Sequence, residues 1–293
     1  MNISGSLVAL ITPMRNQGEV DFIALENLIE WHISSGTSAI VSVGTTGESA
    51  TLSKAEHVEV VAKTIEFARG RVPVIAGTGS NATAEAIEMT VEAAKLGADA
   101  SLQVVPYYNK PEQDGMFAHF KAIAEAVPMP HILYNVPGRT VADMSNETVL
   151  RLTEIENIVG IKDATGDLTR GKQLLAQVPK EFSVYSGDDE TALQLIAAGA
   201  KGDISVTANV APAMMSAMIA AALLGDMLTA EAYNKKLMGL HTGLFVESSP
   251  APSKWALYRM SKLENVLRLP IIPLSSKGEG VVSKAMSQAG IAC

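Results

Sequence analysis

The sequence has one cysteine, no long apolar run and no cluster of basic residues. The cysteine, Cys293, is the last residue, which excludes a disulfide framework and fits a reducing cytoplasm. No apolar stretch approaches the roughly 18 residues of a membrane span, and the nearest is the Ala- and Met-rich segment 211–226. The net charge of −8 argues against a nucleic-acid partner. The first residues lack a cationic leader, so we expect no signal peptide and a cytoplasmic location.

Short β-branched runs alternate with amphipathic helical patterns along the chain. The expected strands are the segments 6–13, 39–47, 72–80, 100–108, 130–137, 158–164, 182–189 and 203–210. They are nearly continuous apolar runs, which is typical of parallel strands that are covered on both faces. Eight strand–helix units predict an α/β fold, the (β/α)8 TIM barrel. A doubly wound open sheet is the alternative, but no Gly-x-Gly-x-x-Gly follows the first strand.

The last part of the chain contains helical patterns only, at 229–245, 252–263 and 278–290. We therefore expect a catalytic barrel over residues 1–225 and a small C-terminal helical domain over residues 226–293. No low-complexity linker separates the two parts.

Polar side chains gather where the expected strands end, which is where barrel enzymes build their active sites. They are Thr45, Thr46, Glu48, Thr78, Tyr107, Tyr108, Tyr134, Asn135, Lys162, Ser186 and Asp188. The five histidines lie mostly in helical patterns, and no two have the spacing of metal ligands. We therefore expect no metal site. The turns "GTTGES" and "AGTGSNATAE" lack the Gly-Lys-Ser/Thr ending of a phosphate loop, but their backbone N–H groups could bind a small carboxylate.

Lys162 stands where the apolar run 158–161 stops. An amine held among apolar side chains loses the hydration of its charged form, which makes a neutral nucleophile accessible. A neutral lysine attacks a ketone or an aldehyde to form an imine, which is an electron sink for making or breaking carbon–carbon bonds. That chemistry needs a proton shuttle, and the strand ends offer hydroxyl groups for it. These belong to Thr45, Thr46, Tyr108 and Tyr134. The structural alternative is a lysine paired with the neighbouring Asp163.

Four motifs, in this order, carry a resemblance to a known family. They are "VSVGTTGESATL" (41–52), "YNVPGRT" (134–140), "GIKDATGDLTR" (160–170) and "SGDD" (186–189). The likeness extends to "ISVTANV" (204–210) and "FVESSPAPSKWAL" (245–257). Together they resemble the dihydrodipicolinate synthase family, which are class I Schiff-base aldolases on a (β/α)8 barrel.

The resemblance implies a reaction and an assembly. The reaction is condensation of pyruvate with L-aspartate 4-semialdehyde to (2S,4S)-4-hydroxy-2,3,4,5-tetrahydrodipicolinate, in the diaminopimelate and lysine pathway. The implied assembly is a homotetramer, a dimer of dimers, and no metal or organic cofactor is implied.

The resemblance also implies catalytic roles by position. Lys162 matches the lysine that forms the imine with pyruvate, and Tyr134 matches the tyrosine that moves protons on the imine intermediates. Thr46 and Tyr108 match its relay partners. In relatives, the tyrosine at the position of Tyr108 reaches into the site from a neighbouring subunit.

Substrate-binding roles follow in the same way. Thr45 and Thr46 match the groups that hold the pyruvate carboxylate. Arg139 matches the arginine that binds the carboxylate of the semialdehyde, a role that suits its planar fork. Gly187 and Ile204 match positions whose backbone lines the site.

An effector pocket for lysine, at a subunit contact near the active site, is a further implication. Its positions are Ser49, Ala50, Lys54, His57, Asn81, Glu85 and Tyr107. Asn81 and Tyr107 suit a carboxylate, and Glu85 suits an ammonium group. Position 54 departs from the pattern, because the best-known inhibited relatives have histidine there. A fixed positive charge disfavours a cationic effector by on the order of 1 kcal/mol. We therefore predict weak or absent inhibition by lysine.

Several candidates have structural alternatives. Tyr107 and Tyr108 could be ordinary aromatic residues of the barrel rim, and Arg139 could pair with Asp143. Glu48 is expected to be structural, binding backbone N–H groups in its own turn.

Two other functions are considered. One is another pyruvate aldolase, such as N-acetylneuraminate lyase or a 2-keto-3-deoxy sugar-acid aldolase, and Thr45 together with Arg139 argues against it. The other is a catalytically silent relative that serves as a binding or scaffold subunit. The presence of the lysine, both tyrosines and the arginine argues against that function.

Overall fold

Eight short parallel strands form a closed barrel in the computed structural model, which describes residues 3–292 and so leaves Cys293 outside the described residues. The strands are β1 (Gly5–Ala9), β2 (Ala39–Ser42), β3 (Val74–Gly77), β4 (Ala100–Val104), β5 (His131–Asn135), β6 (Ile158–Asp163), β7 (Ser183–Ser186) and β8 (Gly202–Ser205). Each strand pairs with the next along the chain, and β8 pairs back with β1. The predicted barrel is confirmed, and the open-sheet alternative is wrong because the sheet has no free edge.

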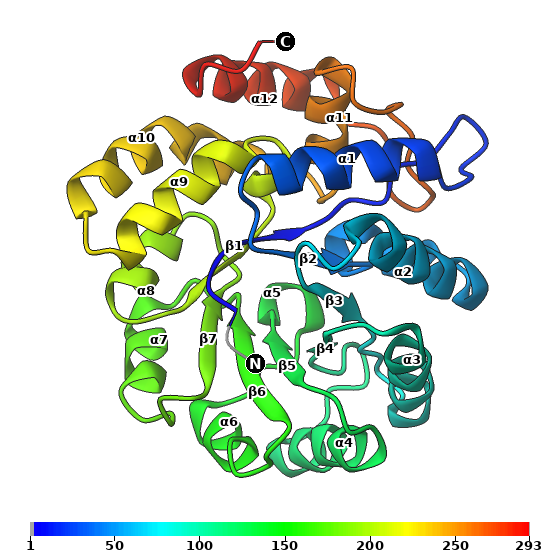
Figure 1. The fold of residues 1–293 in the computed structure, drawn as a ribbon, viewed down its shortest axis with the longest axis vertical. Coiled ribbons are helices and arrows are strands. Elements are labelled where there is room, and N and C mark those ends of the chain that lie inside the picture. The colour runs from blue at the N-terminus through cyan, green and yellow to red at the C-terminus, as the bar shows by residue number, and fades with distance from the viewer. Residues whose placement is uncertain (1–2, 293) are drawn as a thin grey trace.

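Helices surround this barrel (Figure 1). They are α1 (Phe22–Ser34), α2 (Lys54–Ala68), α3 (Thr83–Leu96), α4 (Gln113–Ala126), α5 (Pro137–Thr140), α6 (Asn146–Leu152), α7 (Leu168–Leu175), α8 (Ala192–Ala197) and α9 (Pro212–Leu223). Polar side chains fix several of their starts. At α2, for example, Ser53 and Glu56 form a capping box, in which each side chain binds the backbone N–H of the other residue.

Three further helices follow the last barrel helix: α10 (Met227–Gly243), α11 (Ala251–Arg259) and α12 (Ser276–Gln288). Figure 1 shows α10 beside α9, and α11 and α12 beyond α1. Their buried side chains Leu237, Trp255 and Met286 belong to the same hydrophobic cluster as the barrel helices. The C-terminal helices are therefore packed on the barrel, while the division into two domains at residue 225 stays a prediction.

The barrel strands separate two layers of the core, because successive side chains of a strand point to opposite faces. In β1, Leu7 and Ala9 belong to the cluster inside the barrel, whereas Val8 belongs to the cluster under the helices. Tyr134 and Ile204 also belong to the inner cluster. The strands end earlier than the apolar patterns predicted, and the polar residues beyond them form short turns such as Thr45–Gly47 and Thr207–Asn209.

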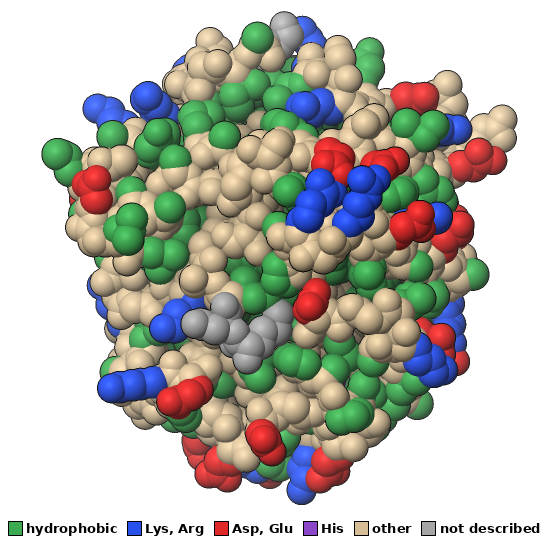
Figure 2. Space-filling model, viewed as in Figure 1, with side chains coloured by type: hydrophobic (Ala, Val, Ile, Leu, Met, Phe, Trp, Pro, Cys, Tyr) green, Lys and Arg blue, Asp and Glu red, His purple; other side chains and the backbone are tan. Residues whose placement is uncertain are grey.

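Charged side chains of both signs are mixed on the surface drawn in Figure 2, where no continuous basic patch is visible among the described residues. No helix within residues 3–292 is both long enough and apolar enough to cross a membrane.

Candidate active site

A cavity of about 470 Å³ opens where the carboxyl ends of the strands meet. We refer to it as the mouth cavity. The predicted site residues in its wall are Thr45, Thr46, Tyr134, Arg139, Lys162 and Gly187. Its volume falls in the range of ligand pockets in proteins. Residues from the ends of β2, β5, β6 and β7 thus meet there, as the barrel fold requires.

Lys162 lies in β6, and its side chain is only 4% exposed. Its Nζ atom lies 4.5 Å from the centre of the Tyr134 ring, and the two residues are register partners in β6 and β5. Asp163 is the next residue of the strand, so its side chain points to the opposite face. Asp163 accepts a hydrogen bond from the backbone N–H of Thr165 at 2.9 Å. Among the described residues, Lys162 has no ion pair with Asp163, so the structural alternative is wrong.

Gly187 leaves room for this lysine. A Cβ atom at position 187 would lie 2.6 Å from Cε of Lys162 and 2.8 Å from Cβ of Ala164. Any larger residue would push the amine out of its place. Ile204, by contrast, is fully buried in the inner cluster, and Val206 lines the mouth cavity from the β8 side.

Thr46 lies in the turn Thr45–Gly47 and is 6% exposed. The hydroxyl of Thr12 donates to the carbonyl of Gly47 at 2.7 Å, which ties this turn to the chain after β1. Tyr108 has a left-handed backbone, with φ of 74°, and its side chain is 90% exposed. The structure therefore brings Thr46 to the mouth cavity within one chain, but it does not bring Tyr108 there.

Arg139 lies in α5, is exposed, and lines the mouth cavity. The alternative pairing with Asp143 is wrong, because Arg170 takes that carboxylate at 2.7 Å. Asp143 also accepts a hydrogen bond from the Asn135 side chain at 2.8 Å. The guanidinium of Arg139 has no ion-pair partner within the described residues and is free to bind an anionic ligand.

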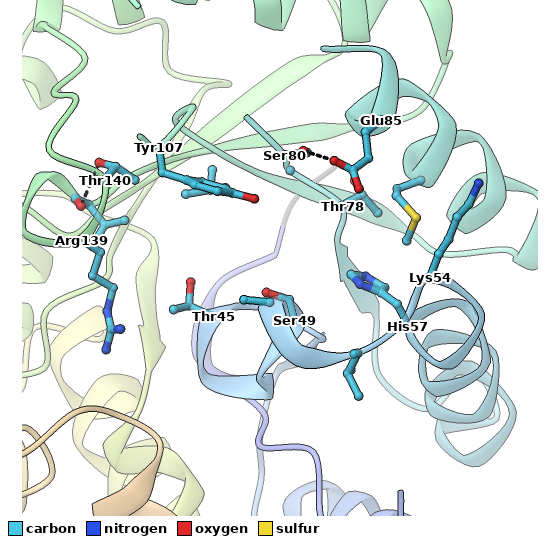
Figure 3. A pocket seen from close by; sticks show the side chains of 16 residues that line it. Thr45, Ser49, Lys54, His57, Thr78, Ser80, Glu85, Tyr107, Arg139 and Thr140 are labelled. Carbon is cyan, nitrogen blue, oxygen red and sulfur yellow. Dashed lines mark hydrogen bonds between the residues drawn. The ribbon is translucent and has the colours of Figure 1, made fainter. Parts of the chain in front are cut away.

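A second pocket of about 290 Å³ adjoins the first and shares Thr45, Val136 and Arg139 with it. We refer to it as the side pocket (Figure 3). It is lined by six of the seven predicted effector residues, namely Ser49, Ala50, Lys54, His57, Glu85 and Tyr107. The seventh, Asn81, is outside its wall, and its side chain donates to the carbonyl of Tyr107 at 3.2 Å. Tyr107 is 41% exposed and lines this pocket.

Charges of both signs lie around the side pocket. Lys54 forms an ion pair with Glu88, and Glu85 accepts a hydrogen bond from Ser80 (Figure 3). The Nε2 atom of His57 lies 2.8 Å from the carbonyl oxygen of Gly77. Burial lowers the pKa of His57, so this ring is neutral at pH 7.

Each of the five histidines has a hydrogen-bond partner in the protein. The partners are Thr37 for His32, Gly77 for His57, Thr83 for His119, Ser101 for His131 and Thr207 for His241. Within residues 3–292, no group of three or more His, Cys, Asp or Glu side chains is placed to hold a metal ion.

The sequence pattern of the dihydrodipicolinate synthetase family matches residues 2–289. The chain belongs to this family. It is 56% identical to the 4-hydroxy-tetrahydrodipicolinate synthase of Stutzerimonas stutzeri, with 99% of each sequence covered. Among solved structures, the chloride-inhibited dihydrodipicolinate synthase of Acinetobacter baumannii, complexed with pyruvate, has a TM-score of 0.98 and 54% identity over 99% of this chain and 100% of that one. The enzyme of Cyanidioschyzon merolae with lysine bound has a TM-score of 0.96 and 40% identity, over 99% and 100% of the two chains.

The partners expected for Glu48, the backbone N–H groups of its own turn, were wrong. Its carboxylate does not bind its own turn but accepts the distant backbone N–H of Arg268 at 3.2 Å and forms an ion pair with Lys254. Glu48 and Lys254 lie in motifs that carry the family resemblance, "GTTGES" and "SSPAPSKW". Only the packing of α11 against the barrel shows that these motifs meet.

A buried carboxyl pair behind the mouth cavity was also missed. Asp189 accepts hydrogen bonds from the backbone N–H groups of Val206 at 3.1 Å and Thr207 at 2.9 Å. Burial raises the pKa of Asp203 well above its ordinary range, and the charge of Asp189 raises it further. The protonated form of Asp203 is therefore favoured relative to an exposed carboxyl group, while Asp189 fixes the backbone next to the cavity wall.

Proposed function

We infer that the chain is a lyase that condenses pyruvate with L-aspartate 4-semialdehyde in lysine and diaminopimelate biosynthesis, the activity of the family to which it belongs. We propose that Lys162 carries this reaction through an imine. One observation above all supports that role. The amine of Lys162 is buried at the wall of the mouth cavity, against the ring of Tyr134 and over Gly187.

The chemistry begins when Nζ of Lys162 attacks the keto carbon of pyruvate and water leaves. The imine then loses a proton from its methyl carbon and becomes an enamine, which attacks the aldehyde carbon of the second substrate. The amino group of that substrate closes onto the imine carbon and releases Lys162. Tyr134, whose ring centre lies 4.5 Å from the amine, is the group that we propose to carry these protons, with Thr46 as its relay partner in the same cavity.

The remaining wall suits two carboxylates. Thr45 and Thr46 hold the carboxylate of pyruvate through hydroxyl and N–H groups, at the position where a short turn presents them. Arg139 binds the carboxylate of the semialdehyde, since its guanidinium lines the cavity without a protein partner in the described residues. Gly187 lines the cavity near Lys162, and the backbone of Ile204, which is not among the residues of the cavity wall, is a further proposed contact.

Tyr108 completes the relay from a neighbouring subunit. Its 90% exposure and left-handed backbone support this role, because an aromatic side chain held out from the rim is placed to enter another copy. The proposed assembly is a homotetramer, a dimer of dimers. Sedimentation of the purified protein tests it, and a fully active monomer would contradict it.

Lysine is the proposed ligand of the side pocket, with the ammonium near Glu85 and the carboxylate near Tyr107 and Asn81. The adjacent walls shared with the mouth cavity support this proposal. The charge of Lys54 is expected to weaken the binding, because both members of its ion pair with Glu88 are exposed and such a pair offsets the charge only in part. A cytoplasmic location and independence of metal and organic cofactors also remain predictions.

The deciding experiment compares two aldehydes at saturating pyruvate. We expect the purified protein to consume L-aspartate 4-semialdehyde and to leave N-acetylmannosamine unchanged. Consumption of the sugar instead would keep the imine chemistry but move the chain to the lyase alternative. Turnover with neither, together with no imine formation, would favour the silent relative.

A further inference from the structure

A fully buried ion pair links the C-terminal helices to the turn that carries Thr45 and Thr46. Lys254 of α11 pairs with Glu48, and both side chains are 0% exposed. The ammonium group of Lys254 also donates to the carbonyl of Val266 at 2.8 Å. A buried pair of charges seldom gives more stability than well-packed apolar side chains of the same volume. Stability alone therefore does not explain why two charges are placed here.

Glu48 immediately follows the turn Thr45–Gly47 and has a left-handed backbone, with φ of 59°. Residues other than glycine rarely adopt this conformation, and they keep it only where the surroundings determine it. Here the contacts of the Glu48 carboxylate hold the backbone in this conformation. The carboxylate is bound by the ammonium of Lys254 and by the backbone N–H of Arg268, the latter at 3.2 Å. The direction of the chain beyond Thr46 is thus set from α11 and the segment after it.

The segment after α11 makes further contacts with the chain that follows Glu48. The guanidinium of Arg268 donates to the carbonyl of Thr51 at 2.8 Å and to the carboxylate of Glu56 at 3.0 Å. It also donates to the carbonyl of Gly18 at 2.8 Å. The chain from Glu48 to the start of α2 is therefore fixed against the C-terminal part at several points, and at Glu48 the contact is one residue from the turn.

We propose that Lys254 and Glu48 are positioning residues for catalysis: their ion pair holds Thr45 and Thr46 in the geometry that pyruvate and the proton relay require. This inference rests on the proposed function. Lys162 comes from β6 and is held independently by Gly187 and Tyr134. Loss of the ion pair should therefore spare imine formation and impair the later proton transfers.

The test replaces both charges at once, because removing one partner leaves the other buried and unpaired. In the double variant Glu48→Gln with Lys254→Met, the amide oxygen can still accept the N–H of Arg268. The control is Glu30→Gln with Arg71→Met, which removes an exposed ion pair between α1 and the segment that follows α2, away from the turn. For each protein we would measure the melting temperature, kcat, KM for pyruvate and borohydride trapping of the pyruvate imine.

We expect the double variant to melt within a few degrees of the wild type and to trap pyruvate on Lys162 at saturating concentration. Its kcat should fall about tenfold or more, because displacements near 1 Å have such effects on catalytic groups. Its KM for pyruvate should rise, and the control should keep both constants. A purely structural role would lower the melting temperature and leave kcat of the folded protein unchanged.

A folded double variant with kcat and KM within twofold of the wild type would overturn the proposal. If the double variant does not fold, Glu48→Asp is the deciding variant, since it keeps both charges and only shortens the side chain that carries the carboxylate. A lower kcat at an unchanged melting temperature supports positioning, and an unchanged kcat overturns it. Failure of the proposed function is a separate result, because the wild type itself would then show neither turnover nor trapping.

Discussion

The mouth cavity and the side pocket share Thr45, Val136 and Arg139, yet the rest of their walls comes from different elements and different kinds of side chain. The mouth cavity draws on the ends of barrel strands and places a buried amine beside a tyrosine ring. The side pocket draws on the turn after β2 and on α2 and α3, and it holds charged groups that already have partners, Lys54 with Glu88 and Glu85 with Ser80. The first is suited to covalent chemistry and proton transfer, and the second to recognition of a charged ligand.

The shared wall residues are a route by which the two proposed sites would communicate. A ligand bound in the side pocket would contact Thr45 and Arg139 from one side, and substrates in the mouth cavity would contact them from the other. Substitutions of residues that line only the mouth cavity should therefore impair the reaction itself, and substitutions of residues that line only the side pocket should change its regulation.

The largest effect is expected for Lys162→Ala. Without the amine no imine can form, so turnover should fall by about 10³-fold or more. Steady-state kinetics with both substrates measure the loss. Lys172→Ala, which removes an exposed lysine of α7, is the control and should keep wild-type kinetics. Retention of more than a tenth of the activity in Lys162→Ala would refute the imine mechanism.

Tyr134→Phe should rank second. It keeps the ring against Lys162 but removes the hydroxyl that carries protons, and general acid–base groups contribute about 10²- to 10⁴-fold. Tyr185→Phe is the matched control for Tyr134→Phe, because Tyr185 is also buried in the barrel. Its hydroxyl donates to the carbonyl of Ile3 at 2.8 Å. That control should lose about 1 kcal/mol of unfolding free energy and little activity. Equal activity of the two variants would remove Tyr134 from the mechanism.

Arg139→Met should separate the two substrates. We expect KM for the semialdehyde to rise by about 10- to 100-fold, the effect of one charge-assisted contact, while KM for pyruvate changes little. Arg139→Lys should recover only part of the loss, since an ammonium cannot form the same fork. Arg151→Met, on α6 and paired with Asp114, is the surface control. An effect confined to KM for pyruvate would place Arg139 at the other carboxylate.

The smallest effect concerns the side pocket. We predict weak inhibition of the wild type by lysine, and a sub-millimolar inhibition constant at neutral pH would contradict it. Lys54→His should strengthen inhibition by about fivefold, because a neutral ring removes on the order of 1 kcal/mol of charge repulsion. Lys63→His changes a lysine of the same helix, paired with Glu66, and should leave the inhibition constant unchanged.

The mouth cavity could be predicted largely from the sequence, whereas its supports could not. Lys162, Tyr134 and Thr46 follow apolar runs, and a parallel barrel brings such positions to one end whatever the details of packing. The pairing of Glu48 with Lys254 depends on how α11 lies against the barrel, which no local pattern reveals. The same holds for Asp143, whose partner is Arg170 and not Arg139, although Arg139 is only four residues away in the sequence. Local propensity sets the elements, and long-range packing sets the partners of the charges.

One buried amine, that of Lys162, carries the proposed chemistry. The most direct test is to treat the wild-type protein with isotopically labelled pyruvate and borohydride, digest it, and map the labelled peptide by mass spectrometry. We expect a single stable adduct on the peptide that contains Lys162, and no adduct in Lys162→Ala. A label on another lysine, or none in a protein that consumes both substrates, would contradict it.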